Sequence, residues 1–234
     1  MKIAIDSGLQ TSGDAIRGIG VHTRELVDHL KSFKDIPVDL IDFKKTDLTK
    51  FDIAHYPLFR PYFLTLPFFR PCKKVVLTIH DLIPLIYPSE YPPGIKGKIK
   101  FMIQKFNLRN VDAVITISET SKKDIVRFLG FPPDKIYVIY LASQTTELKI
   151  TSNKLKEIKR KYNLPDKFVL YVGDVNYNKN LLSLAAACKK VDIALVIVGK
   201  QATEQNFNRA NWENHTWVEF LQKYSQDPKI KRVG

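Results

Sequence analysis

The stretch AVITISETSKKDIVRFLGFPPDKIYVIYLA, residues 113–142, decides the fold class of this chain. An apolar, β-branched run at 113–118 is followed by a helical pattern and then by a second apolar run at 136–142. Ser118 is expected to cap the start of the helix, and Gly130 to follow its last turn. A strand, a helix and a strand in this order predict parallel strands joined by a crossover helix.

The same alternation continues on both sides of this unit. Upstream, the apolar runs that indicate buried strands are residues 2–5, 38–43 and 74–80. Downstream, a basic connector at 143–161 precedes a second series, with strands expected at 168–173 and 193–199, helices at 180–190 and 216–225, and a last short run at 230–234. We therefore predict an α/β protein with two Rossmann-like, doubly wound domains, at 1–145 and 146–234. The second is expected to be incomplete, because so small an open sheet leaves apolar surface and a strand edge uncovered.

Bulk composition indicates a globular protein that binds anions. Of the 234 residues 44% are apolar, which is enough for a core, and the net charge is +13. That charge favours nucleic acid, a membrane surface or phosphorylated small molecules as partners. Cys72 and Cys188 lie far apart and outside any Cys/His cluster, which argues against a disulfide framework and against a zinc site.

The glycine-bearing stretch DAIRGIGVHTREL, residues 14–26, has two interpretations. It is a poor dinucleotide fingerprint, because Thr23 stands where the third glycine belongs and the preceding strand ends too early. What remains is a loop with several glycines that leads into a helix N-terminus and binds an anion there. A loop without a ligand is the alternative. The glycines of this loop are Gly8, Gly13, Gly18 and Gly20.

Two further segments place polar residues at the carboxyl ends of expected strands, where open α/β sheets bind ligands. One expected strand ends in His80 and Asp81, and the histidine is suited to hydrogen bonding or proton transfer. Lys179 and Asn180 open the helix after FVLYVG, where a lysine and the helix dipole act together on a phosphate. Each segment has an ordinary alternative. His80 and Asp81 could form a structural pair, and Lys179 could be an exposed surface lysine.

The basic stretch GIKGKIKFMIQKFNLR, residues 94–109, leaves two readings open. It matches a helix on a membrane surface, and it equally matches our preferred reading, a helix packed on the sheet with a cationic outer face. The aromatic and proline-rich residues 56–71 predict a long loop. No nucleic-acid-binding module is recognisable, so nucleic acid is disfavoured as a partner. No signal peptide or spanning segment is visible either, and we expect a cytoplasmic protein, with contact at the inner face of the membrane left open.

Taken in order, these segments resemble the glycosyltransferases of family 4, which have the GT-B fold. GIGVHTREL is similar to the family's GIGRYTREL, and HYPLFRP followed by VVLTIHDLIPLIYP to its HSP and VVTIHDL segments. The stretch 114–142 matches a family block along nearly its whole length. FVLYVGDVNYNKNL and LVIVGK resemble the opening of the family's donor-side domain.

The resemblance implies a hexosyltransferase of polysaccharide biosynthesis. It would transfer a hexose from a nucleotide diphosphate sugar to a saccharide or lipid-linked acceptor, with retention and without a metal or other cofactor. His80 would be the catalytic residue lining the sugar site, and Lys179 would contact the donor diphosphate. Substrate or donor binding is also expected for Gly18, Gly20, Ser118 and Asn180.

Three departures from the family pattern affect this expectation. Asp174 stands where many members have an arginine, and Asn178 stands where one subfamily has an arginine before the lysine. The family's E-x7-E segment, which holds the donor, would lie beyond residue 234. We therefore expect these 234 residues alone to be weakly active or inactive. A truncated binding protein without catalysis, or one half of a split glycosyltransferase, is the alternative function.

Overall fold

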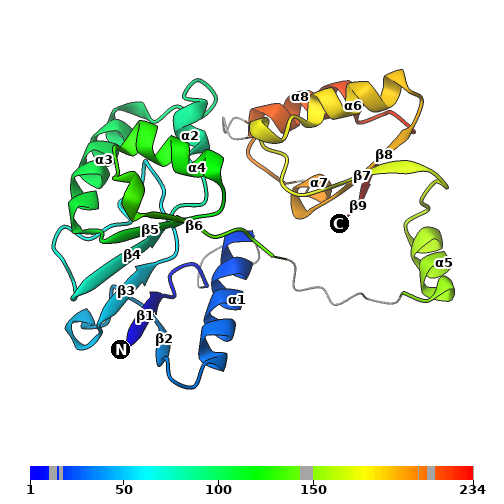
Figure 1. Ribbon diagram of the computed structural model, residues 1–234. Coiled ribbons are helices and arrows are strands. Elements are labelled where there is room, and N and C mark those ends of the chain that lie inside the picture. Colours follow the sequence, from blue (N-terminus) through cyan, green and yellow to red (C-terminus); the bar gives the residue numbers. More distant parts are fainter. Residues whose placement is uncertain (11–14, 16–17, 143–149, 205, 210–213, 234) are drawn as a thin grey trace. The chain divides into compact units, whose positions relative to one another are not determined.

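The computed structural model describes residues 1–10, 15, 18–142, 150–204, 206–209 and 214–233 (Figure 1). The chain divides into two compact units. The first comprises Met1–Pro88 and Pro92–Ala142, and the second Ser89–Tyr91 and Ser143–Gly234. The domain boundary expected after residue 145 falls outside the described residues and stays a prediction.

The first unit is built on a six-stranded parallel sheet with the order β2-β1-β3-β4-β5-β6. Its strands are β1 (Ile3–Asp6), β2 (Val38–Ile41), β3 (Ile53–Tyr56), β4 (Lys74–Thr78), β5 (Ala113–Thr116) and β6 (Ile136–Val138). The parallel α/β prediction is confirmed, while β3 was not expected from the sequence. β1 lies between β2 and β3, so the winding of the chain reverses there, and ligands of such sheets bind at this point.

Helices cover both faces of this sheet. They are α1 (Gly18–Ser32), α2 (Ile83–Ile86), α3 (Gly94–Asn107) and α4 (Glu119–Asp124), which continues as a π-helical turn over Ile125–Leu129. Successive residues of β1 point to opposite faces, and accordingly Ala4 and Ile5 belong to different apolar clusters. The two expected helix ends are confirmed. Ser118 accepts a hydrogen bond from the Ser121 amide, and Gly130 has a left-handed φ of 69°.

Helix α3 packs through the face opposite to the one that the sequence favoured. Its buried residues are Gly97, Gln104 and Asn107, not the apolar stripe. The Gln104 carboxamide oxygen accepts hydrogen bonds from the Thr65 and Leu66 amides, at 3.2 and 3.0 Å. Since the irregular backbone of the 56–71 loop needs such partners, polar side chains take the inward face. The reading of α3 as a helix with an apolar inner face is therefore wrong.

The second unit contains a three-stranded parallel sheet with the order β7-β8-β9. The strands are β7 (Phe168–Val172), β8 (Ala194–Val198) and β9 (Ile230–Val233), and the helices are α5 (Ser152–Lys161), α6 (Leu181–Lys190), α7 (Lys200–Thr203) and α8 (His215–Tyr224). Trp217 and Phe220 of α8 are almost fully buried against Leu181 of α6 and Leu195 of β8. This core fixes the start of α6 relative to the carboxyl ends of the strands.

Gly199 follows β8 and lies against the backbone of Gly173. A Cβ on Gly199 would lie 2.6 Å from the Gly173 carbonyl oxygen. We predict that Gly199→Ala lowers the free energy of unfolding of the second unit by about 1–3 kcal/mol, because the backbone must shift. Urea unfolding followed by tryptophan fluorescence measures this. Replacing the exposed neighbour Lys200 with alanine is the control, and equal stability of the two variants would contradict the prediction.

Candidate functional site

His80 lies directly after β4, at the carboxyl end of the first sheet. Its backbone is fixed by Ser121, whose hydroxyl donates a 2.8 Å hydrogen bond to the His80 carbonyl oxygen. Both ring nitrogens are buried and have no hydrogen-bond partner within the described residues. The ring of His22, in the second turn of α1, stands edge-on to it, with 5.1 Å between ring centroids. The structure thus brings the start of α1 to His80.

His55, in the centre of β3, is a third histidine of this region and was not singled out from the sequence. It is only 5% exposed, and 2.8 Å separates its Nε2 from the Thr78 hydroxyl oxygen. His22, His55 and His80 stand on α1, on β3 and after β4, around the point where the winding reverses. In the sequence they are far apart, and only the pairing of β3 with β4 brings His55 beside Thr78.

Burial keeps these imidazoles neutral. It lowers the pKa of His80 to about 4, with a further contribution from the charge of protonated His22. Burial also lowers the pKa of His55 to about 4, and protonated His22 and His80 would disfavour its charged form further. The pKa of His22 is lowered for the same reason, although Glu25 partly opposes the shift. At neutral pH, His80 is therefore suited to exchange hydrogen bonds with a hydroxyl group and does not supply a positive charge.

The neutral state of His55 makes stability depend on pH. Below about pH 6.5 the unfolded chain protonates this histidine, whereas the folded chain does not until about pH 4. Stability therefore falls as the pH falls through this window. We predict that the first unit loses about 2 kcal/mol of unfolding free energy through His55 between pH 7 and pH 5.

Urea unfolding of the parent chain and of His55→Gln at both pH values, followed by circular dichroism, tests this. The variant should lose about 2 kcal/mol less than the parent on acidification. His29→Gln, at an exposed position of α1, is the matched control. An equal loss in the parent and in His55→Gln would contradict the assignment.

Ser118 and Asp81 have structural contacts of their own. The Ser118 hydroxyl donates to the Ser121 hydroxyl at 3.0 Å while it caps α4. Ser118 thus joins the His80 backbone through one intervening side chain. The Asp81 carboxylate accepts a hydrogen bond from the Ile83 amide at 3.2 Å, at the start of α2. Asp81 therefore does not form the His-Asp pair that the sequence left open.

The sequence had suggested that Gly18 and Gly20 belong to a loop before the helix. In the structure they form the first turn of α1. Gly18 is exposed, and a Cβ placed on it would meet no atom within 4 Å. Gly20 is buried, and its carbonyl oxygen accepts a 2.8 Å hydrogen bond from the Gln10 side chain. The first amides of a helix have no partner inside it, so this turn offers donors to an anion. Gly13 lies outside the described residues.

Lys179 and Asn180 belong to the second unit and lie after β7. Lys179 ends a 3₁₀ turn (Tyr177–Lys179), and Asn180 precedes α6 with a left-handed φ of 51°. Both side chains are exposed. In the part of the chain that the structure describes, Lys179 forms no ion pair with a carboxylate. The lysine and the first amides of α6 therefore provide positive charge at one helix start.

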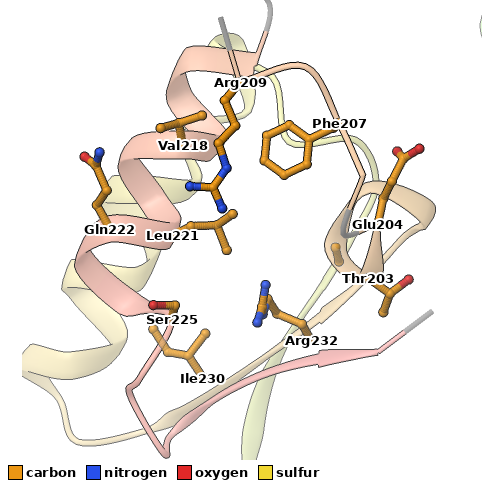
Figure 2. A pocket seen from close by; sticks show the side chains of 11 residues that line it. Thr203, Glu204, Phe207, Arg209, Val218, Leu221, Gln222, Ser225, Ile230 and Arg232 are labelled. Carbon is orange, nitrogen blue, oxygen red and sulfur yellow. The ribbon is translucent and has the colours of Figure 1, made fainter.

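A separate hollow of about 690 Å³ lies in the second unit between α7, α8 and β9 (Figure 2). Figure 2 shows the guanidinium groups of Arg209 and Arg232 on opposite sides of it, with Phe207 and Glu204 along one wall. Neither Lys179 nor Asn180 lines it. This hollow is a second cationic surface that the sequence did not indicate.

The described residues contain no cluster of three or more His, Cys, Asp or Glu side chains that could hold a metal ion. Cys72 and Cys188 are both free thiols. None of the helices in the described ranges has the length and apolar character needed to cross a membrane.

Comparison with solved structures defines the fold. The chain superposes along its whole length on 69% of HepE from Anabaena, crystallised with UDP and glucose, with a TM-score of 0.61 and 14% identity. At that identity the likeness concerns the fold, which is the GT-B type with two Rossmann-like units. The fold expected from the sequence is thereby confirmed.

Sequence comparisons show which family and which curated proteins the chain is similar to. Residues 39–144, just under half of the chain, match the model of Glycosyltransferase Family 4, which confirms the resemblance. The chain is 24% identical to the serotype-specific mannosyltransferase WbdA of Escherichia coli over 128 residues, 54% of this chain and 16% of that protein. It is 25% identical to the O-antigen chain mannosyltransferase B of Escherichia coli over 171 residues, 69% of this chain and 42% of that protein. The chain thus spans less than half the length of these curated relatives.

Proposed function

We propose that this protein transfers a hexose from a nucleoside diphosphate sugar to a saccharide or lipid-linked acceptor, with retention of configuration. One observation carries the proposal. His80 presents ring nitrogens that have no hydrogen-bond partner among the described residues, at the carboxyl end of a parallel sheet and beside the start of α1. A buried polar atom normally has a hydrogen-bond partner, so such nitrogens indicate a ligand with hydroxyl groups.

The proposed roles follow from the chemistry of each position. His80 exchanges hydrogen bonds with a sugar hydroxyl as a neutral imidazole. The backbone at Gly18 and Gly20 approaches the substrate without a Cβ in the way. Lys179, Asn180 and the first amides of α6 stabilise the negative charge of the departing nucleoside diphosphate. In this proposal no metal ion is needed to neutralise the leaving group.

The relatives suggest which substrates to test first. HepE was crystallised with UDP-glucose, and the curated relatives are named as mannosyltransferases of O-antigen synthesis. We propose a polysaccharide of this type as the acceptor class, and the cytoplasm as the place of reaction.

A panel of UDP- and GDP-linked hexoses tests the function. The purified chain is incubated with each donor and a saccharide acceptor, and released nucleoside diphosphate and labelled product are measured. Donor-dependent transfer supports the proposal, and its rate shows whether these residues alone are as weakly active as expected. Failure of every nucleotide and nucleotide sugar in the panel to bind or react would contradict the proposal.

A further inference from the structure

Helix α3, labelled in Figure 1, carries a continuous stripe of exposed apolar side chains. Ile95, Ile99, Met102 and Phe106 are between 54% and 80% exposed. Their spacing of four, three and four residues places them in one line along the helix. The buried Gly97 and Gln104 lie on the opposite side, so this stripe has no part in the core.

The 56–71 loop extends this apolar surface. Phe63 and Phe68 are 56% and 52% exposed, and the neighbouring Leu64 and Phe69 are exposed as well. Lys100 of α3 lies 5.6 Å from the Phe63 ring centroid, and the Asn110 side chain donates a 3.1 Å hydrogen bond to the Phe68 carbonyl oxygen. The loop aromatics thus flank α3, and we call the two together the α3 surface.

Unpaired cations surround the stripe. They are Lys96, Lys98, Lys100, Lys105 and Arg109. None of them forms an ion pair with a carboxylate within the described residues, and the stretch 94–111 contains no Asp or Glu. By contrast, Arg70 and Lys74 are both paired with Asp112. The charge of the α3 surface therefore remains available to an anionic partner.

We propose that the α3 surface binds a bilayer that contains anionic lipids. An exposed apolar stripe with flanking lysines and arginines is the pattern of a helix that lies in the headgroup region. The apolar side chains enter the boundary of the acyl chains, while the cations contact lipid phosphates. A protein partner would have to supply both acidic and apolar groups over this whole area, whereas an anionic bilayer supplies them everywhere. The binding is peripheral and would bring the enzyme to acceptors held in a membrane.

Co-sedimentation with vesicles tests this inference without any nucleotide or acceptor, so its outcome is independent of the transfer assay. The probes are vesicles of phosphatidylcholine, with and without one third phosphatidylglycerol. We expect binding to the anionic vesicles only, and a strong decrease in binding at high salt. Lys98→Ala/Lys105→Ala/Arg109→Ala should lower the partition coefficient about 100-fold.

Two further variants separate the α3 surface from bulk charge. Lys154→Ala/Lys156→Ala/Lys159→Ala removes the same charge from α5 and should bind nearly as the parent does. Ile99→Ser/Met102→Ser keeps the charge and should weaken binding at least about tenfold. The proposal would be overturned if the triple variants of α3 and α5 lost vesicle binding equally, or if the serine variant bound as the parent does. Absence of binding to the anionic vesicles would also overturn it. Sedimentation velocity would then show whether the chain instead self-associates through these residues.

Discussion

Replacing His80 with alanine is expected to lower the rate of sugar transfer about 100-fold or more. The imidazole is buried and neutral, and in the part of the chain that the structure describes its nitrogens have no hydrogen-bond partner, so they can act on a substrate hydroxyl. Loss of one such oriented group from a site that excludes water typically costs two to three orders of magnitude. Because burial lowers the pKa of His80 to about 4, the rate should show no step near pH 6.5 from this residue.

The measurement uses labelled donor with protein in excess over several hours, so that a large loss is detectable even from a slow parent. His29→Ala removes an exposed histidine from the same helix as His22 and should retain the parent rate. Circular dichroism verifies that both variants are folded. If the folded His80→Ala variant transfers sugar within threefold of the parent, His80 is not the catalytic residue.

Replacing Lys179 with alanine is expected to weaken the binding of nucleoside diphosphates roughly 10- to 100-fold. A hydrogen bond between an ionised donor and an ionised acceptor contributes about 1.5–3 kcal/mol, which corresponds to this range. Lys179 is exposed and forms no ion pair with a carboxylate among the described residues, so its charge is available for the ligand. Asp174 stands where many family members have an arginine, and Asn178 where one subfamily has one, so the proposed cationic contact would depend more strongly on Lys179.

Calorimetric titration of UDP and GDP into both proteins measures the effect. Lys190→Ala, in the last turn of α6, removes an equal charge at the end of that helix far from Lys179 and should bind as the parent does. Equal affinity of the parent and of Lys179→Ala would exclude the lysine from the diphosphate site. Equal weakening by both variants would indicate a general effect of charge.

The strands with continuous apolar runs were predictable from sequence because burial on both faces leaves such runs in parallel sheets. The helix ends at Ser118 and Gly130 were predictable because capping depends on local residue chemistry. β3 was not predictable in this way. It has four residues with His55 in the middle, and its strand conformation depends on pairing with β1 and β4 on both sides.

The candidate site shows the same division between local and long-range information. His80 was foreseeable, because it follows a recognisable strand. The contributions of His22, His55 and Ser121 arise from tertiary packing and left no signal in the local pattern. The orientation of α3 was not predictable from the sequence. Its apolar periodicity was clear, but hydrogen bonds between Gln104 and a distant loop determine which face is buried.

The most direct test of the account is to map nucleotide binding onto the backbone. Amide resonances of the isotope-labelled chain are recorded while UDP or GDP is added. The largest shift changes are expected at residues 178–181, with further changes at Gly18, Gly20 and His80 when a sugar nucleotide is used. Changes confined to the hollow formed by Phe207, Arg209 and Arg232 would contradict it.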